Sequence, residues 1–245
     1  VTDATVNIYL FAVWKIRPRH PPPNRFSSVL FCPPKIMPQK IVIVTGFGPF
    51  VGHEERNASW EAVNLLPDVF PFRKDTYELR KYKVPVTYAE VDRIVPHIWN
   101  QQPDLVVHVG VHGQIHTINL EHCSYTSGYC KPDFAKRCLP CDKITLSGKH
   151  AAEPECTMLK TNLDIERIAK ELNLETNVQC CCSTEVGNYL CGYIYLKSLD
   201  VNPDRTLFIH VPKVDEPYSS EQTMATIYNV IGKCLEQLPA ERKLP

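Results

Sequence analysis

Three residues of this sequence have side chains that could act together in nucleophilic catalysis. The first, Cys191, follows the turn residues Gly187 and Asn188 and opens an apolar stretch that is typical of a buried helix. We expect Asn188 to cap that helix and Cys191 to lie in its first turn. Unpaired amide hydrogens and the helix dipole favour an anion there, and the thiolate is the nucleophilic form of cysteine.

A cysteine nucleophile also needs a base and a group that orients the base. His210 ends the apolar run 207–209, and Glu121 ends the run 118–120 in the same way. Because strand ends and helix starts share one edge of an open α/β sheet, we expect both side chains beside Cys191. Taken singly, Cys191 could be an inert buried thiol, His210 a core histidine and Glu121 a paired or solvated carboxylate. Together, the three favour a catalytic site.

The elements that must position these residues alternate between strands and helices. We expect strands at 41–44, 78–86, 105–109, 115–121, 178–182 and 206–211, and helices from Asn57 and over 88–100, 163–172, 187–199 and 221–238. Pro96 is a candidate kink or break in the second helix. From 123 to 154 the periodicity disappears, which is typical of a functional loop or an insertion. This order predicts one α/β domain over residues 39–245, with a mostly parallel central sheet and helices on both faces.

Composition and charge narrow the class of function. The 245 residues are 44% hydrophobic, which is enough for one sizeable core. Lys plus Arg and Asp plus Glu both number 27, so the formal net charge is zero. No overall field would then recruit nucleic acid or an anionic membrane, and a small neutral ligand fits better. The 11 cysteines include the run 180–182, which is poorly suited to a disulfide framework, so we expect reduced thiols and a cytoplasmic location.

The first 38 residues differ from the rest. Their prolines are too dense for a helix or sheet interior, and we expect a disordered extension before the catalytic domain. The apolar run 8–14 is too short to span a bilayer and lacks a cleavage site, so it is a poor signal peptide. Met37 directly precedes the predicted domain, so the extension is either native or the product of an alternative start or gene model.

Other motifs allow more than one interpretation. The glycine-containing loop 45–52 lacks the spacing of a nucleotide-binding motif, and Phe47 and Phe50 in it could either clamp a flat apolar ligand or plug the sheet edge. The Cys-x-x-Cys sequence at 138–141, with two cysteines upstream, could bind zinc or act in redox chemistry, but its spacing favours loop cysteines without such a role. Histidines recur at 108, 112 and 116, a spacing that suits one face of a helix; their surroundings predict a strand, so we expect no metal site.

Five motifs in register resemble the pyroglutamyl-peptidase I family of cytosolic cysteine peptidases, and most of all its animal members. They are Thr45-Gly46-Phe47-Gly48-Pro49-Phe50 with 57–60, then 108–111, 119–121, 187–191 and 208–212. The resemblance covers residues 40 to 238 and leaves 1–38 without a counterpart. It implies Glu121, Cys191 and His210 as catalytic residues, and it implies Phe47, Phe50 and Asn57 as the substrate pocket.

The resemblance also implies a reaction. Peptides that begin with pyroglutamate (5-oxoproline) would be cleaved after that residue through a thioester on Cys191, with no cofactor or metal and with no nucleic acid or membrane as partner. Backbone amides near Cys191 and at Phe47 and Gly48 would stabilise the oxyanion. Two other hypotheses remain open at this stage: a catalytically silent relative that binds pyroglutamyl-capped peptides, and a thiol-rich zinc or redox protein. Whether the protein is a monomer or a homo-oligomer is also open.

Overall fold

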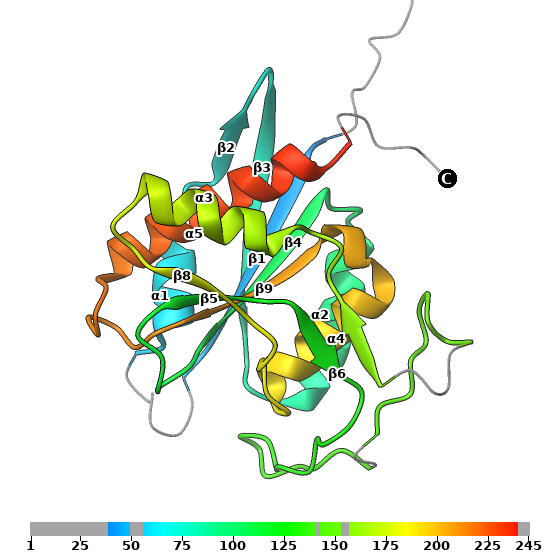
Figure 1. The fold of residues 1–245 in the computed structure, drawn as a ribbon. Helices are drawn as coiled ribbons and strands as arrows, with labels where there is room; N and C mark the ends of the chain where they lie inside the picture. Colours follow the sequence, from blue (N-terminus) through cyan, green and yellow to red (C-terminus); the bar gives the residue numbers. More distant parts are fainter. Residues whose placement is uncertain (1–38, 50–55, 141–142, 153–156, 240–245) are drawn as a thin grey trace, which may run out of the picture. The chain divides into compact units, whose positions relative to one another are not determined.

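The computed structural model describes residues 39–49, 56–140, 143–152 and 157–239, so the expected extension 1–38, Phe50 and Cys141 lie outside the described residues. Its strands are β1 (Ile41–Phe47), β2 (Val69–Phe72), β3 (Asp75–Val84), β4 (Leu105–Val111), β5 (Ile118–Glu121), β6 (Cys123–Tyr125), β7 (Met158–Lys160), β8 (Cys180–Ser183) and β9 (Thr206–Val211) (Figure 1). Its helices are α1 (Ala58–Leu65), α2 (Tyr88–Trp99), α3 (Ile165–Glu175), α4 (Leu190–Val201) and α5 (Ser220–Gln237), with a short 3-10 helix at Pro203–Arg205.

Seven strands form the central sheet, in the order β2-β3-β1-β4-β9-β5-β8. The pairs β1–β3, β1–β4, β4–β9 and β5–β8 are parallel, which confirms the prediction of a mostly parallel sheet. The pairs β2–β3 and β5–β9 are antiparallel. The antiparallel β5–β9 pair corrects one expectation: β5 and β9 end at opposite edges of the sheet, so Glu121 and His210 do not meet at a shared carboxyl edge.

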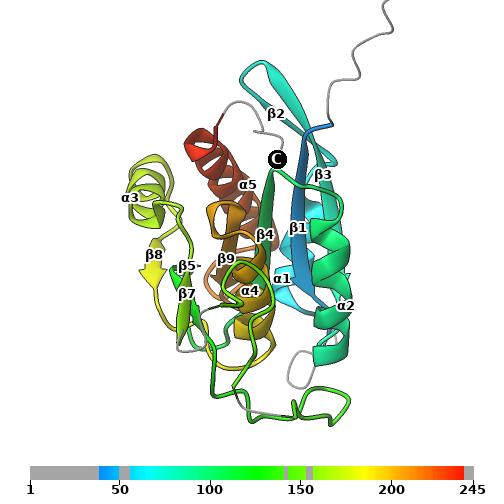
Figure 2. The same cartoon turned by 90° about the vertical axis from the view of Figure 1, so that its right-hand side faces the viewer.

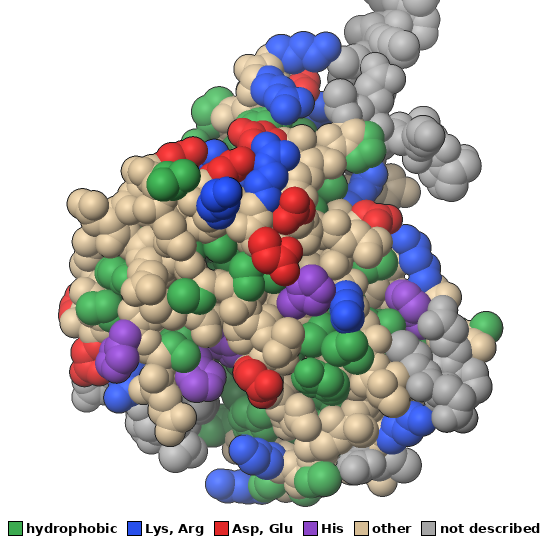
Figure 3. Space-filling model, viewed as in Figure 1, with side chains coloured by type: hydrophobic (Ala, Val, Ile, Leu, Met, Phe, Trp, Pro, Cys, Tyr) green, Lys and Arg blue, Asp and Glu red, His purple; other side chains and the backbone are tan. Residues whose placement is uncertain are grey.

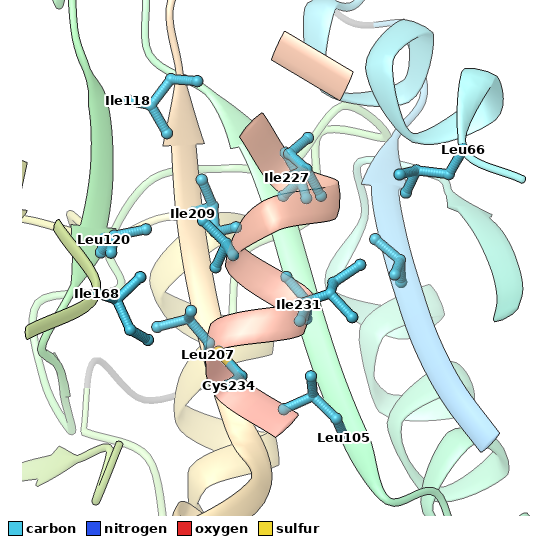
Figure 4. Close-up of a cluster of buried hydrophobic side chains, with 14 of the residues drawn as sticks. Leu66, Leu105, Ile118, Leu120, Ile168, Leu207, Ile209, Ile227, Ile231 and Cys234 are labelled. Atoms are coloured by element: carbon cyan, nitrogen blue, oxygen red, sulfur yellow. The ribbon is translucent and has the colours of Figure 1, made fainter. Parts of the chain in front are cut away.

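Helices cover both faces of this sheet, as the alternation of elements predicted (Figure 2). Buried side chains of α1, α3 and α5 form the core on one face, where Ile227 and Ile231 of α5 lie over Leu207 and Ile209 of β9 (Figure 4). Buried side chains of α2 and α4 form a second core on the other face. Because both faces of β4 and β9 are buried, apolar side chains lie on both faces of each strand.

The structure adds elements that the sequence pattern did not predict. β2 is one of them, and it forms a hairpin with β3, with Arg73 in the left-handed region at the turn (φ 55). Within the stretch expected to be irregular, β6 pairs with β7 outside the main sheet. Helix α2 continues through Pro96, so no break occurs there.

The helix start predicted at Asn57 is confirmed, whereas the predicted cap of α4 is not. The Asn57 side chain accepts a hydrogen bond from the Ser59 amide and caps α1, which starts where the sequence predicted a helix. At α4 the expected cap is wrong: the N-cap residue is Tyr189, which makes no side-chain capping bond, and Asn188 precedes it. Cys191 is nevertheless the second residue of α4, within the first turn as predicted.

A buried polar network joins α4 to the sheet beneath it. The His108 ring on β4 lies 2.8 Å from Thr45 Oγ1 through Nδ1 and 2.7 Å from Ser198 Oγ through Nε2. Trp99 Nε1 also donates to Ser198 Oγ, at 3.3 Å. Burial lowers the pKa of His108 to about 3, so the ring is neutral.

Side chains four residues apart share a face of a strand as well as of a helix. The sequence argument that placed His108 and His112 on different faces of a strand was therefore wrong.

Two buried carboxylates hold the long loop that follows β6, which lies near the start of α4 at the bottom of Figure 1. Asp133 accepts hydrogen bonds from the amides of Tyr88 and Arg137. Asp200, near the end of α4, accepts from the amides of Ser147, Gly148 and His150. These carboxylates satisfy backbone donors that have no secondary structure to pair with, and so fix the loop on the helical layer.

The surface agrees with the balanced charge of the sequence. On the face shown in Figure 3, Lys and Arg side chains lie interspersed with Asp and Glu. None of the described helices combines the length and apolar character needed to cross a membrane.

Candidate active site

Glu121 and His210 form a buried hydrogen-bonded pair across the β5–β9 ladder. Glu121 is directly opposite Phe208 in this ladder, and Asn119 is opposite His210. Opposite residues share a face of the sheet, as do residues two apart on one strand, so Glu121 and His210 are diagonal neighbours on the face covered by α4. The distance from His210 Nδ1 to Glu121 Oε1 is 2.8 Å, and the two residues are 2% and 1% exposed.

Cys191 lies beside His210 because the sheet has a gap beneath the sulfur. Gly110 pairs with His210 in the β4–β9 ladder and carries no side chain. A Cβ at Gly110 would lie 2.8 Å from Cys191 Sγ and 2.8 Å from Phe208 Cζ. The missing side chain therefore makes room for the sulfur at the surface of the sheet.

The electrostatics of this group favour a protonated histidine. Burial by itself would lower the pKa of His210, but its hydrogen bonds to Cys191 and Glu121, together with their negative charges, outweigh burial and raise the pKa to about 9. At neutral pH the ring is then an imidazolium, placed between a carboxylate and a sulfur that can carry a negative charge. This arrangement can hold a proton ready for transfer.

Two hydrogen bonds hold Glu121 in place, one at its carboxylate and one at its backbone carbonyl. Tyr195 of α4 donates a hydrogen bond from its hydroxyl to the Glu121 carbonyl oxygen, at 2.8 Å. The second carboxylate oxygen, Oε2, is buried and has no hydrogen-bond partner among the described residues. Its charge is therefore directed mainly at His210.

A cavity of about 340 Å³ opens onto Cys191 and His210. Two of the three residues predicted to bind substrate, Phe47 and Asn57, line it; the third, Phe50, lies outside the described residues. No carboxylate lines the cavity among the described residues. The described residues that line it are Phe47, Asn57, Val86, Val111, His112, Gly113, Lys131, Val186, Gly187, Asn188, Tyr189, Leu190, Cys191 and His210.

The loop at Phe47 and Gly48 is braced by Asn57. Asn57 Nδ2 donates to the Gly48 carbonyl at 2.8 Å, and Asn57 Oδ1 accepts from Ser59. The Phe47 amide donates to Ser59 Oγ, and the Gly48 amide donates to the Val84 carbonyl. Both loop amides are thus used within the fold, and the expectation that they would stabilise an oxyanion is wrong.

The first turn of α4 offers amides in their place. The first backbone hydrogen bond in the helical pattern runs from the Tyr193 amide to the Tyr189 carbonyl, at 2.9 Å. The amides of Leu190, Cys191 and Gly192 come before it, where a helix has no partners for its own N–H groups. These amides and the positive end of the helix dipole lie beside the sulfur of Cys191.

His112 is a cavity residue that the sequence analysis did not assign to the site. Its amide donates to the Val211 carbonyl at 2.9 Å, and its ring packs edge-on against His210 with centroids 5.4 Å apart. Nδ1 of His112 accepts a hydrogen bond from the Gln114 amide, at 3.4 Å. Burial and the positive charge of His210 lower the pKa of His112. Its position two residues past Gly110 was the available signal, because that spacing returns to the same face of the sheet.

The long loop after β6 supplies one wall of the cavity. Gly128 has φ +94, and a Cβ there would lie 2.0 Å from Asn188 Nδ2, so the loop backbone packs directly on the turn before α4. The backbone carbonyl of Lys131 accepts a hydrogen bond from the Tyr88 hydroxyl, at 3.0 Å. The segment that the sequence left as a functional loop or an insertion therefore borders the site.

Among the described cysteines, Cys191 alone lines the cavity. Every cysteine in the described ranges carries a free thiol. Within those ranges no three His, Cys, Asp or Glu side chains are grouped so that they could hold a metal ion. Cys138 of the Cys-x-x-Cys pair is exposed, and its partner Cys141 lies outside the described residues.

Comparison with known proteins places this arrangement in a family. The chain is 34% identical to human "Pyroglutamyl-peptidase 1" over 203 residues, which cover 82% of this chain and 92% of the human protein. It is 32% identical to "Pyrrolidone-carboxylate peptidase" of Thermococcus onnurineus, over 78% of this chain and 96% of that protein. A mutant pyrrolidone carboxyl peptidase from Pyrococcus furiosus has the same fold, with a TM-score of 0.70 at 23% identity over 81% of this chain and 100% of its own.

The family profile described as pyroglutamyl peptidase matches residues 40–236, which span both cores and every element that carries Glu121, Cys191 and His210. This chain therefore belongs to the pyroglutamyl peptidase family and is a hydrolase of that type.

Proposed function

We propose that this enzyme is a cysteine exopeptidase that hydrolyses the bond after an N-terminal pyroglutamyl residue of small peptides. The observation that carries the proposal is the juxtaposition of a cysteine in a helix first turn with a buried histidine whose other nitrogen lies 2.8 Å from a carboxylate. Names of its relatives, pyroglutamyl-peptidase and pyrrolidone-carboxylate peptidase, support the choice of substrate.

In this proposal Cys191 is the nucleophile. Its thiolate attacks the carbonyl carbon of the pyroglutamyl residue, and the resulting oxyanion is stabilised by the first-turn amides of α4. The His210 imidazolium donates its proton to the leaving amine as the carbon–nitrogen bond breaks, which leaves a thioester on Cys191. Neutral His210 then takes a proton from water, the water attacks the thioester, and free pyroglutamate and thiolate result.

Glu121 has an orienting role. Its hydrogen bond to Nδ1 directs the opposite nitrogen of His210 toward Cys191, and its charge stabilises the imidazolium. The diagonal placement of Glu121 on a neighbouring strand keeps this bond independent of any loop.

The cavity lining supports a neutral terminus over a charged one. An ordinary peptide begins with an ammonium group, which would lose its hydration inside the cavity without a carboxylate among the described lining residues to compensate. The pyroglutamyl lactam carries no charge there, and apolar side chains such as Phe47 and Val86 can pack against its ring. Asn57 contributes mainly by holding the loop that bears Phe47.

We further propose that the enzyme acts in the cytoplasm. Its chemistry needs a reduced nucleophile, and the cysteines of the described residues are free thiols. Peptides with an N-terminal pyroglutamate would be its partners in solution.

The test is release of the fluorophore from pyroglutamyl-aminomethylcoumarin in reducing buffer, with alanyl-aminomethylcoumarin as the charged comparison. We expect turnover of the first substrate only, and we expect the Cys191→Ser variant to lose about three orders of magnitude in rate. Equal turnover by that variant would reject the proposed nucleophile. Equal turnover of both substrates would reject the proposed specificity.

A further inference from the structure

His210 lies on β9, between β5 and β4. The proposed mechanism assigns catalytic side chains to β9 and β5, and none to β4. β9 carries His210 itself, and β5 carries Glu121 on one side of it. On the other side lies β4, where Gly110 faces His210 and leaves room for Cys191. The chain beyond β4 continues the ladder for one step, because the His112 amide donates to the Val211 carbonyl at 2.9 Å.

This extension places His112 in a definite relation to His210. His112 is two residues past Gly110, so it is a diagonal neighbour of His210 on the same face of the sheet, as Glu121 is from the opposite side. The two imidazole rings meet at a centroid distance of 5.4 Å with an angle of 73° between their planes. Phe208 packs on His210 as well, at 4.8 Å and 62°.

His210 thus has an aromatic neighbour on its own strand, a carboxylate on β5 and a second ring beyond β4. It is only 2% exposed although it lines the cavity, and His112 lines the same cavity beside it. The His112 ring is itself held in place, because Nδ1 accepts the Gln114 amide and the backbone is tied to β9. Two oriented rings pack favourably edge to face, whereas two imidazolium ions would repel each other.

We propose that His112 is a positioning residue for His210: its neutral ring packs against the imidazolium and keeps Nε2 of His210 aimed at Cys191. The inference rests on the proposed function for its catalytic consequence, but the contact itself concerns only the two rings. His112 acts through its aromatic surface and donates no hydrogen bond to the substrate.

In this role the packing surface of the His112 ring matters and its nitrogen atoms do not. Three substitutions at His112 distinguish the two contributions. His112→Phe keeps a flat ring against His210 and removes both nitrogens. His112→Gln keeps an N–H donor of similar reach and removes the ring. His112→Ala removes both. His116→Ala is the matched control, because His116 is an exposed histidine of the same segment.

Two readouts are needed. The first is kcat and KM for pyroglutamyl-aminomethylcoumarin at neutral pH. The second is the rate at which iodoacetamide alkylates Cys191, followed by mass spectrometry of the peptide that contains it, since this rate reports the cysteine and histidine pair without any substrate. We expect His112→Ala and His112→Gln to lose about tenfold in kcat and in alkylation rate, with KM changed less than about threefold. We expect His112→Phe and His116→Ala to stay within about threefold of the unsubstituted enzyme on both readouts.

Other outcomes overturn the inference. Activity retained by His112→Gln and lost by His112→Phe would make His112 a hydrogen-bond donor to the substrate. Wild-type values for all variants would leave His112 without a role, and a loss of kcat with unchanged alkylation would separate it from His210. If no protein hydrolysed the substrate while alkylation followed the expected pattern, the proposed function would fail and the positioning role would stand.

Discussion

Glu121 and His210 are not opposite each other in the sheet; they are diagonal neighbours across an antiparallel pair of strands, with Oε1 and Nδ1 2.8 Å apart. The contact depends on the register of β5 against β9. A slip of one residue would turn the Glu121 side chain to the other face of the sheet, into the core beneath α3 and α5. The register is secured by the Tyr195 hydroxyl, which binds the Glu121 carbonyl from α4.

The first prediction concerns the charge of Glu121. In Glu121→Gln, His210 loses the carboxylate that helps to hold its proton, so its pKa should fall below about 9. Because the mechanism needs the imidazolium, the alkaline limb of the profile of kcat/KM against pH should move to lower pH. We expect kcat/KM at its optimum to fall about 100-fold or more. The measurement is the pH profile with a pyroglutamyl fluorogenic substrate.

Glu185→Gln is the control for this change, since Glu185 is an exposed carboxylate near the turn before α4. Its profile should match that of the unsubstituted enzyme. An unmoved alkaline limb in Glu121→Gln, in protein that remains folded by circular dichroism, would mean that Glu121 does not set the pKa of His210.

The second prediction concerns the gap at Gly110. In Gly110→Ala the new Cβ would lie 2.8 Å from Cys191 Sγ and 2.8 Å from the ring of Phe208, which is fully buried and cannot withdraw freely. The sulfur should be displaced relative to His210, with a loss of about 100-fold in kcat/KM. Steady-state kinetics test this.

Gly232→Ala is the matched control for that substitution. Gly232 lies within α5, and the nearest atom to a Cβ there is Phe70 Cζ at 3.6 Å, an ordinary contact. Activity should be unchanged, and the free energy of unfolding should rise by about 0.5–1 kcal/mol because alanine is the better helix former. If both glycine variants kept full activity, the proposed gap would have no function.

The three catalytic residues Glu121, Cys191 and His210 illustrate how much of the site could be predicted from the sequence. Their chemical types and their places at the ends of apolar runs were enough to bring them together, and the alternation of elements was enough to predict the sheet. The direction of β5 was not predictable, because an apolar run of four residues carries no signal for parallel or antiparallel pairing. The predicted geometric reason for the contact was therefore wrong although the contact exists.

Other features depended on tertiary contacts that a single sequence does not encode locally. Asn188 has the residue type of a helix cap, yet its side chain packs near Gly128 and Tyr189 takes the N-cap position. The amides of Phe47 and Gly48 looked free in a glycine-rich loop, but Ser59 and Val84 accept their hydrogen bonds. The sequence argued against His112 as a metal ligand, and nothing in the sequence indicated that its ring would contact His210.

The third prediction concerns stability in acid. Folded His108 has a pKa of about 3, whereas in the unfolded chain it has its ordinary value of 6.5. Between these values the unfolded state binds more protons at this residue, so the contribution of His108 to the free energy of unfolding is fully present above pH 6.5 and falls by up to about 1.4 kcal/mol per pH unit as the pH drops toward 3. Urea unfolding at several pH values between 7 and 4 measures the slope. In His108→Gln, which cannot titrate, the slope should be smaller by this amount, and parallel curves for the two proteins would contradict the assignment.

The fourth prediction concerns the loop held by Asp200. In Asp200→Asn the amide keeps one acceptor oxygen in place of two, so at least one of the bonds from the Ser147, Gly148 and His150 amides is lost, and with it the charge that strengthens all three. Each such bond contributes about 1.5–3 kcal/mol, so the loop should open locally and trypsin should cut after Lys149 faster than in the unsubstituted enzyme.

Limited proteolysis with peptide mapping measures the rate of cleavage after Lys149. Glu185→Gln, at an exposed carboxylate that is not paired with Lys149, is the control and should leave the rate unchanged. Because Asp200 lies at the far end of α4 from Cys191, kcat/KM should change less than about threefold, and a larger loss would mean that this part of the loop supports the active site directly.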